Sequence, residues 1–309
     1  MNILMTGSSG WLGQHLVPRL KRSGHTVIGL DPVAGPHTDI VGTVADRDTV
    51  RRALRQHRIQ GVVHAGALHK PHVATHDATE FIATNVQGTL NLLQEATARG
   101  STVDRFVFTS TTSLMISQQI REAHKRGVDR AFWIDEEMNE LQPRNIYGVS
   151  KLSAEHLCRM VHEASRLPIV ILRTGRFFPE EDDMAQEIIQ SGPNTKANEF
   201  LFRRLTVKDA AAAHIVALDR APQVGFDTFI ISALTPFSPD DCEQLIEYAP
   251  IVVHRYFPRY REIYARRGWT MFDYIDRVYD SNKAMRRMGF VCQTDFGDIL
   301  TQLDREDGV

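Results

Sequence analysis

A tyrosine and a lysine lie four residues apart in the stretch Tyr147-Gly-Val-Ser-Lys151. On a helix, side chains with this spacing share one face, so the two groups can act as a single acid/base unit. A neighbouring ammonium stabilises a phenolate and lowers the pKa of the phenol from about 10 towards neutrality. The pair therefore predicts a general base for the oxidation of an alcohol. The alternative is a surface lysine above a packed tyrosine, and the rest of the chain decides between the two.

The first residues of the chain have the order strand, glycine turn and helix that a dinucleotide requires. Residues 2–6 form an expected buried strand, and Gly7-Ser-Ser-Gly10-Trp-Leu-Gly13 follows it directly. Gly7 allows the tight turn, Gly10 lets backbone amides approach a pyrophosphate, and Gly13 lets the helix pack closely on the strand. The phosphates would then lie at the N-terminus of the helix.

The next expected strand ends in an acidic residue, Asp31. A carboxylate at this place accepts hydrogen bonds from the adenosine ribose hydroxyls and repels the 2′-phosphate of NADP. No arginine or lysine lies between Asp31 and Asp46 to offset that repulsion, so the sequence favours NAD. The alternative is an aspartate that only begins the Asp31-Pro32 turn.

With both ends of the site in view, the chain resembles the extended short-chain dehydrogenase/reductase family, the NAD-dependent epimerases and dehydratases that act on sugar nucleotides. Besides the glycine turn, the motifs that carry the resemblance are Val62-Val-His64-Ala-Gly-Ala67, Asn85-Val-Gln-Gly-Thr-Leu-Asn-Leu-Leu93, Phe106-Val-Phe-Thr-Ser-Thr111, Pro143-Arg-Asn-Ile-Tyr147-Gly-Val-Ser-Lys151, Leu205-Thr-Val-Lys-Asp209, Asp280-Ser-Asn-Lys-Ala284 and Met288-Gly-Phe290. Several motifs in order are much more specific than any one of them, and these cover most of the chain.

The resemblance implies a hydride-transfer mechanism with NAD as the cofactor. Tyr147 would take the proton of a substrate hydroxyl while hydride leaves the same carbon. Lys151 would hold the nicotinamide ribose and keep Tyr147 acidic, and Thr111 would hydrogen-bond the reacting oxygen. The residues implied in cofactor binding are Gly7, Gly10, Trp11, Leu12, Gly13, Asp31, Ala65, Asn85 and Lys151. For Asn85, a structural role that joins its helix to the active-site strand is an equal alternative.

Departures from the family pattern bear on the substrate, for which Thr112, Arg176 and His69 are the predicted contacts. Thr111 is followed by Thr112-Ser113 where dehydratases have an acidic pair, and this disfavours elimination of water. Arg176 stands where the family usually has the asparagine that contacts a sugar nucleotide. Residues 176–206 form a short excursion, which indicates a reduced nucleotide subsite. Residues 114–140 form a long one with an expected polar helix over 118–126, and we expect it to lie over the substrate as a lid.

Arginines and aromatic residues gather between residues 235 and 279. Guanidinium groups grip phosphate or carboxylate while rings stack on a sugar or base, so this region suits an anionic substrate. The alternative is a solvated charged face. The residues are Arg255, Tyr256, Arg259, Arg261, Tyr264, Arg266, Arg267 and Trp269.

Histidines at positions 69, 72 and 76 follow an expected strand. A pair with helical spacing can ligate a metal, but Pro71 and the loop position argue against a preformed site, and we predict no metal. A substrate or nicotinamide contact from His69 is the functional interpretation, and an exposed loop is the alternative.

Composition excludes several function classes. The chain has 309 residues, 42% of them apolar, and a formal net charge of −2, which gives no support to a nucleic-acid surface. Its three cysteines lie far apart and suggest neither a zinc site nor a disulfide framework. The sequence has no signal-length or membrane-length apolar stretch, so we expect a cytoplasmic protein with no membrane partner.

Strands and helices alternate along the chain and predict an α/β fold, a doubly wound parallel (Rossmann) sheet with a smaller substrate-binding lobe. The expected strands are 2–6, 26–30, 61–65, 104–109, 168–172 and 227–231, and the expected helices are 11–23, 46–57, 77–98, 146–165 and 208–219. We assign 1–175 and 207–232 to the NAD-binding domain, and 176–206 and 233–309 to the lobe. The resemblance also implies a homodimer in which helices 77–98 and 146–165 pair as a four-helix bundle.

Three functions remain open at this point. The first is an NAD-dependent epimerase acting on a small-molecule sugar, which the resemblance implies is carried on a nucleotide. The second is a net dehydrogenase of a sugar or uronate, which the short 176–206 excursion and Arg176 favour. The third is a non-catalytic NAD-sensing protein, against which Thr111, Tyr147 and Lys151 weigh.

Overall fold

A parallel sheet forms the centre of the molecule. The computed structural model describes residues 1–179 and 190–307, and within them seven strands pair in the order β3-β2-β1-β4-β5-β7-β8, all parallel. These strands are β1 (Asn2–Thr6), β2 (Thr26–Asp31), β3 (Ile40–Val41), β4 (Gly61–His64), β5 (Arg105–Thr111), β7 (Ile169–Thr174) and β8 (Phe226–Ile231). The order changes direction between β1 and β4, and ligands of such sheets bind outside the carboxyl ends of the strands at that point.

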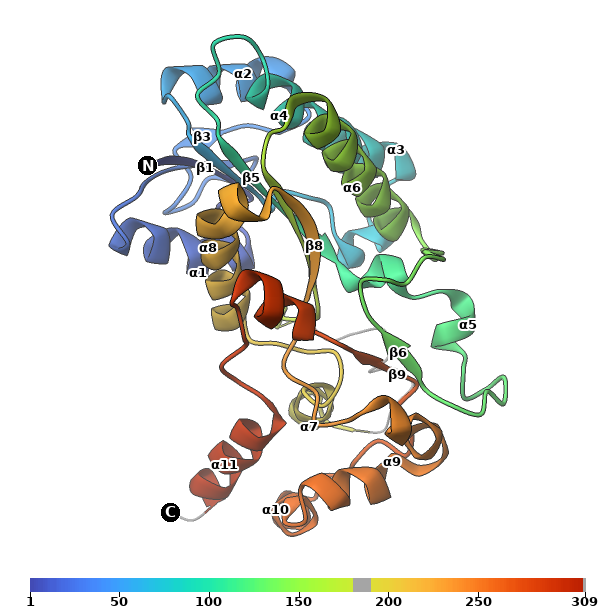
Figure 1. Cartoon of the computed structure of the whole chain (residues 1–309). Coiled ribbons are helices and arrows are strands. Elements are labelled where there is room, and N and C mark those ends of the chain that lie inside the picture. The colour runs from blue at the N-terminus through green and yellow to red at the C-terminus, as the bar shows by residue number, and fades with distance from the viewer. Residues whose placement is uncertain (180–189, 308–309) are drawn as a thin grey trace.

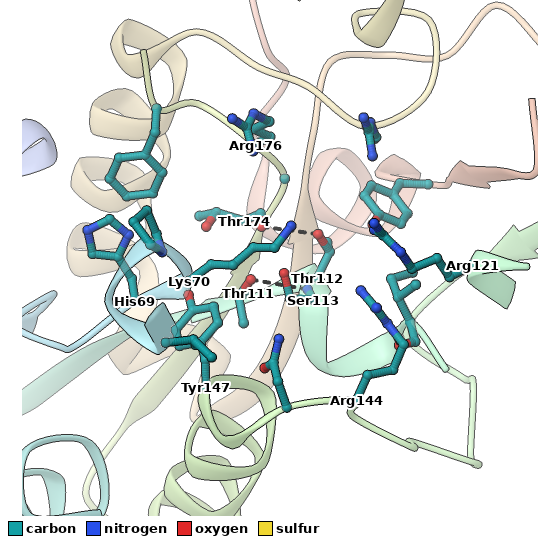
Figure 2. Close-up of a pocket in the computed structure, with 18 of the residues that line it drawn as sticks. His69, Lys70, Thr111, Thr112, Ser113, Arg121, Arg144, Tyr147, Thr174 and Arg176 are labelled. Carbon is teal, nitrogen blue, oxygen red and sulfur yellow. Dashed lines mark hydrogen bonds between the residues drawn. The ribbon is translucent and has the colours of Figure 1, made fainter. Parts of the chain in front are cut away.

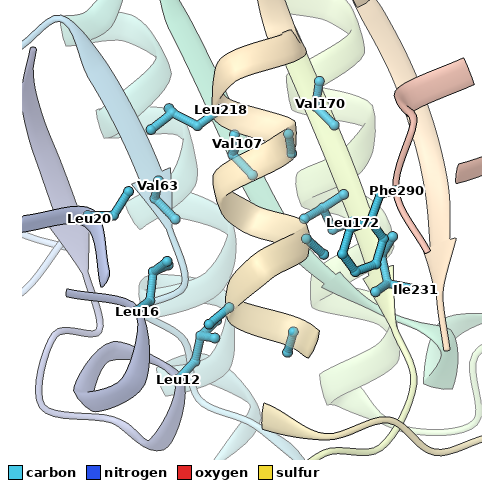
Figure 3. Packing of buried hydrophobic residues seen from close by; sticks show 14 of the residues in the cluster. Leu12, Leu16, Leu20, Val63, Val107, Val170, Leu172, Leu218, Ile231 and Phe290 are labelled. Carbon is cyan, nitrogen blue, oxygen red and sulfur yellow. The ribbon is translucent and has the colours of Figure 1, made fainter. Parts of the chain in front are cut away.

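The two faces of the sheet bury different side chains. Ile3 and Met5 of β1 pack on one face against α1 (Trp11–Arg22) and α8 (Val207–Val224), whereas Leu4 packs on the other. Figure 3 shows Leu16 of α1, Leu218 of α8 and Val63 of β4 in the cluster on the first of these faces. The opposite face is covered by α2 (Arg47–Gln56), α4 (Gly88–Ala96) and α6 (Ile146–Ser165) (Figure 1). Because both faces are buried, the strands are nearly continuous in apolar residues, as parallel strands are. The predicted doubly wound Rossmann fold is confirmed.

A second hydrophobic core lies below the carboxyl edge of the sheet and forms the lobe (Figure 1). Its elements are α7 (Gly192–Glu199), α9 (Cys242–Tyr256), α10 (Tyr260–Arg267), α11 (Phe296–Asp307) and the parallel pair β6 (Phe132–Ile134) and β9 (Arg277–Tyr279). Residues 180–189 and 308–309 of the predicted lobe lie outside the described residues.

Packing crosses the predicted domain boundaries in two places. Ala131 belongs to the core of the lobe although it was assigned to the NAD-binding domain. Ala284, Met288 and Phe290 were assigned to the lobe, yet they pack in the core of the sheet beside α8. The division into two domains therefore stays a prediction.

The described elements differ from the expected ones mainly at their ends. The predicted helix 77–98 consists of α3 (Ala78–Phe81), a π-helical segment over Ile82–Gln87, and α4. The predicted helix 118–126 is wrong in length, since α5 covers only Gln118–Arg121 and turns continue to Gly127, whose φ is +65°. β5 runs on to Thr111 and β7 to Thr174, because polar residues there are buried at the edge of the site.

No helix among the described residues is long and apolar enough to cross a membrane.

Burial in the sheet core predicts a large difference between two valine substitutions. Val63 of β4 is 0% exposed, whereas Val33 is 63% exposed. Val63→Ala removes two methyl groups and leaves a cavity, so we expect it to lower the free energy of unfolding by about 2 kcal/mol. Val33→Ala is the matched control and is expected to change it by less than about 0.5 kcal/mol. Urea unfolding measures both, and equal losses would contradict this account of the core.

Candidate active site

The glycine turn between β1 and α1 packs against the loop that follows β4. Gly7 has a φ of +75°, and a Cβ on it would lie 2.8 Å from the backbone nitrogen of Gly66. A Cβ on Gly13 would lie 2.3 Å from the carbonyl oxygen of Gly7. Both positions therefore require glycine, and the turn brings Gly7 beside Ala65, the predicted contact on the loop after β4.

The N-terminus of α1 has the features of a pyrophosphate site. Gly10 is its N-cap residue, no side chain caps the helix, and its first turn has no acidic residue. The N–H groups there are donors that an anion can use. Trp11 begins the helix, and its buried Nε1 has no hydrogen-bond partner among the described residues, while Leu12 is buried in the core. These residues fit a dinucleotide.

Asp31, at the end of β2, shapes the glycine turn. Its carboxylate accepts hydrogen bonds from the backbone nitrogens of Ser9 at 3.0 Å and Val33 at 2.9 Å. A carboxylate has about four lone-pair sites, so two more can accept ribose hydroxyls. The structural and the ribose-binding interpretations of Asp31 are therefore compatible.

The predicted catalytic residues gather at the carboxyl end of β5. Thr111 ends this strand, and Tyr147 and Lys151 lie in the first two turns of α6. All three are buried, and Thr111 and Tyr147 line a cavity of about 500 Å³ (Figure 2). The Lys151 ammonium donates to the carbonyl oxygen of Thr109 at 2.7 Å and lies 4.7 Å from the ring centroid of Phe108.

Burial shifts the pKa values of the pair in opposite directions. It raises the pKa of Tyr147 to about 12, against the lowering effect of the Thr111 hydroxyl. It lowers the pKa of Lys151 to about 8. Desolvation dominates the pKa of Tyr147 in this arrangement, in which the Lys151 amine is directed at the Thr109 carbonyl, so the lowering of that pKa by Lys151 stays a prediction.

A buried ion pair fixes α6 to the sheet. Glu155 lies one turn beyond Lys151 on the same face, and Arg173 of β7 donates to it from Nε at 3.1 Å and from Nη2 at 2.7 Å. Ser110 of β5 donates to the same carboxylate at 2.5 Å. Both charged side chains are nearly inaccessible to solvent. The network holds the face that carries Tyr147 and Lys151 against the strand that carries Thr111.

His214 of α8 supports the same strand from the other face of the sheet. Its Nδ1 lies 2.7 Å from the carbonyl oxygen of Ala210, and its Nε2 lies 2.8 Å from the hydroxyl of Thr109. Because a carbonyl only accepts, the neutral ring donates from Nδ1 and accepts from Thr109. Burial lowers the pKa of His214 to about 4, so the ring is neutral at physiological pH.

Asn85 has a structural role in this arrangement. Its amide nitrogen donates to the carbonyl oxygen of Leu68 at 2.8 Å and to the Ser150 hydroxyl at 2.9 Å. Its amide oxygen accepts from the Leu68 nitrogen at 2.8 Å. Asn85 thus ties the loop after β4 to α6, which supports the structural alternative for this residue.

The predicted substrate residues Arg176, Thr112 and His69 all line the cavity. The His69 ring stacks on Phe178, with ring centroids 4.8 Å apart. Burial lowers the pKa of His69 to about 4. The Thr112 hydroxyl donates to the carbonyl oxygen of Thr174 at 3.3 Å, so it also joins β5 to β7.

The arginine and aromatic residues between 255 and 269 lie elsewhere, and none of them lines the cavity. Arg266 pairs with Glu262 and Asp304, and Arg255 pairs with Asp241. The Tyr264 hydroxyl is buried against Asn198. The eight residues singled out at 255–269 therefore do not supply the expected substrate contacts, since their ion pairs join α9, α10 and α11 to neighbouring elements. Arg277 and Tyr279 of the same 235–279 region do line the cavity.

Sequence reasoning missed several basic residues of the cavity. Each of these basic residues lies inside or close to a motif noted in the sequence, and its position beside that motif is the signal that could have identified it. They are Lys70, Arg121, Arg144, Arg203 and Arg277. Among the described residues, no group of three or more histidine, cysteine or acidic side chains is arranged to hold a metal ion.

Residues 3–229 match the sequence model of the NAD dependent epimerase/dehydratase family, which covers most of the chain. The chain belongs to this family. NAD is the cofactor of this family, and the glycine turn, the N-terminus of α1 and Asp31 remain its predicted contacts.

Curated relatives of the chain include two UDP-glucose 4-epimerases. That of Rhizobium meliloti (strain 1021) is 31% identical over 182 residues, which are 56% of this chain and 50% of the relative. That of Neisseria meningitidis serogroup C is 26% identical over 215 residues, 64% of this chain and 59% of the relative. The matches thus span only about half to three-fifths of the relatives' length.

Solved structures with the same fold match nearly the whole chain. UDP-N-acetylglucosamine 4-epimerase from Bacillus cereus has a TM-score of 0.65 and 21% identity, with 99% of this chain and 98% of that one covered. UDP-glucuronic acid 4-epimerase from Bacillus cereus in complex with NAD also has a TM-score of 0.65, with 19% identity and coverage of 99% and 100%.

The buried ion pair predicts a loss of stability when its acid is neutralised. Glu155→Gln leaves the Arg173 charge buried without its counter-ion, so we expect the free energy of unfolding to fall by about 3–5 kcal/mol. Glu122→Gln is the control, because Glu122 pairs with Arg126 in an exposed i,i+4 bridge, and its denaturation midpoint should stay that of the wild type. An unchanged denaturation midpoint in Glu155→Gln would contradict the claim that the Glu155–Arg173 ion pair fixes α6 to the sheet.

The neutral state of His214 predicts a pH dependence. Its pKa is about 4 in the folded protein against 6.5 for an ordinary histidine. The unfolded chain therefore binds the proton more readily between these values, so this histidine lowers stability as the pH falls from 6.5 to about 4. We expect the free energy of unfolding of His214→Gln to fall less steeply over this window than that of the wild type. Parallel curves would exclude a contribution from His214.

Proposed function

We propose that the protein is an NAD-dependent sugar-nucleotide epimerase that works by transient hydride transfer at a secondary hydroxyl. One observation carries the proposal: Thr111, Tyr147 and Lys151 meet at the carboxyl end of β5 in a member of the epimerase/dehydratase family. The relatives named UDP-glucose 4-epimerase support a sugar nucleotide as the substrate. Neighbours of the same fold whose structures hold NAD, or NAD and UDP, agree with this assignment.

When bound, NAD takes the hydride from the substrate carbon and later returns it. The Tyr147 hydroxyl faces the cavity and takes the proton of the reacting hydroxyl, which turns the alcohol into a ketone. With its pKa raised to about 12 by burial, Tyr147 needs a nearby positive charge to ionise. Lys151, one turn along the same face of α6, is placed to supply that charge. Thr111 orients the reacting oxygen from the opposite side.

The second half of the reaction reverses the first on the other face of the ketone. Tyr147 gives the proton back to the oxygen, and bound NAD would supply the hydride to that other face, which inverts the configuration. The overall reaction needs no external oxidant or reductant. Elimination of water remains disfavoured, since Thr112 and Ser113 offer no carboxyl groups for it.

Basic side chains among the described residues of the cavity support an anionic nucleotide handle. The single carboxylate of Glu199 pairs with Arg203 and Arg204 at 2.6 Å each and lies 3.9 Å from Arg176. Three guanidinium groups thus surround one acid. Arg176 and Arg203 line the cavity, where a diphosphate can accept hydrogen bonds from such groups.

A net dehydrogenase of a sugar or uronate is the second candidate. The observation that favours it is Arg176, which lines the cavity where the resembled pattern has an asparagine. Accumulation of NADH with a carbohydrate substrate is the result that separates this candidate from the epimerase.

We also propose a homodimer formed by the outer face of α3, α4 and α6. Ile82, in the π-helical segment between α3 and α4, is 43% exposed, and Val149 and Met160 of α6 are 41% and 51% exposed. Exposed large apolar side chains on these helices suit an interface. All three cysteines lie among the described residues and are buried and unpaired with one another, which suits the reducing cytoplasm.

Replacing the proposed base tests the function directly. Tyr147→Phe keeps the packing of the ring but has no group to take the proton, so we expect NAD binding to persist while turnover falls by about a hundredfold to ten-thousandfold. The assay follows formation of the epimeric sugar nucleotide from UDP-sugars, and mass spectrometry of the denatured protein measures bound NAD.

Tyr248→Phe is the matched control, since Tyr248 is 47% exposed on α9 and does not line the cavity. It should turn over at the wild-type rate. Wild-type turnover in Tyr147→Phe would disprove the assignment of the base.

A further inference from the structure

The cavity is unusually rich in positive charge. Among the described residues that line it are five arginines and one lysine, and no aspartate or glutamate. A guanidinium offers several hydrogen-bond donors in a plane and matches a carboxylate or phosphate with two parallel bonds. The basic residues are Lys70, Arg121, Arg144, Arg176, Arg203 and Arg277.

Four of these arginines come from two separate parts of the chain that meet at the cavity, and the fifth, Arg277, lies in β9. Arg176 and Arg203 belong to the lobe side, where they face Glu199 and suit the diphosphate of the handle. Arg121 and Arg144 belong to the excursion between β5 and α6. Figure 2 shows Arg121 and Arg144 on one side of the cavity, apart from Arg176 and opposite His69.

The segment between β5 and α6, which carries Arg121 and Arg144, packs against β9. Ile116 and Ile120 are buried in one cluster with Tyr279 of β9. β6 pairs in parallel with β9, so the segment is also joined to the lobe by strand pairing. Arg144 donates from Nε to the carbonyl oxygen of Ile116 at 3.1 Å, which orients its guanidinium.

Arg144 lies close to the reacting centre along the chain. It precedes Asn145, the N-cap of α6, whose side chain accepts from the Gly148 nitrogen, and Tyr147 follows in the first turn. Three peptide steps separate the α-carbons of Arg144 and Tyr147 by at most about 11 Å. Figure 2 shows Thr111 and Ser113 between Tyr147 and Arg144. An anion held by Arg144 would therefore lie within reach of a sugar whose hydroxyl faces Tyr147.

We propose that the substrate sugar itself carries a carboxylate, as in a uronic acid linked to a nucleoside diphosphate, and that Arg121 and Arg144 bind this carboxylate. The proposal rests on the proposed function and specifies its substrate class. A carboxylate accepts charge-assisted, bidentate hydrogen bonds that the hydroxymethyl group of a neutral hexose cannot accept. Arg121 and Arg144 are thus specificity-determining residues, distinct from the groups that move the proton.

Binding to the Tyr147→Phe protein, which turns substrate over too slowly to disturb the measurement, tests the proposal. Calorimetry with UDP-glucuronate and UDP-glucose compares two ligands that differ at the carboxylate and share the handle. We expect UDP-glucuronate to bind about tenfold to a hundredfold more tightly, the ratio that hydrogen bonds to a charged group supply.

Arg121→Gln and Arg144→Gln, each in the same background, locate the effect. Each should reduce the preference for UDP-glucuronate over UDP-glucose at least about tenfold, because it removes donors to the carboxylate and none to the nucleotide handle that both ligands share. Arg126→Gln is the matched control, since Arg126 lies in the same excursion, pairs with Glu122 and does not line the cavity. It should keep the preference of the parent.

The outcomes separate this proposal from the proposed function. If the two ligands bind equally, or if both arginine variants keep the full preference, the carboxylate proposal is overturned while a sugar-nucleotide epimerase stands. If neither ligand binds to protein that retains NAD, the proposed function fails and the carboxylate proposal fails with it.

Discussion

The contact between α6 and the sheet depends on the buried pair of Glu155 and Arg173. Each of these charges is costly to bury alone, so both are tolerated only when α6 lies at one position against β5 and β7. Ser110 completes the carboxylate's hydrogen bonds one residue before Thr111. The same helix face carries Tyr147 and Lys151, so the pairing that satisfies the buried charges also sets the catalytic groups opposite Thr111.

Burial gives the site its chemistry and also its main electrostatic cost. It raises the pKa of Tyr147 to about 12 and lowers that of Lys151 to about 8, which opposes the ionised state of both groups. Tyr147 therefore stays protonated at neutral pH, and cannot accept a proton, until positive charge approaches its phenol oxygen. Proton removal would then be coupled to the arrival of substrate and cofactor, and this coupling suits an enzyme that must hold a reactive ketone between two hydride transfers.

Local patterns predicted the parts of the structure that depend on neighbours in sequence. The glycine turn, the strand order and the helix with Tyr147 and Lys151 follow from spacing and periodicity, and the fold agrees with them. The basic residues of the cavity do not follow, because Arg121, Arg203 and Arg277 converge only through tertiary packing. The arginines of α10 misled sequence reasoning for the same reason, since their partner Asp304 lies on α11.

The central claim is that hydride leaves one carbon of the sugar and returns to that same carbon from the other face. The most direct test uses a sugar nucleotide deuterated at the carbon whose configuration changes, followed by mass spectrometry and NMR of the epimeric product. The account predicts that the product keeps its deuterium at that carbon and that no NADH accumulates. Accumulation of deuterated NADH, or exchange of the deuterium with water, would contradict it.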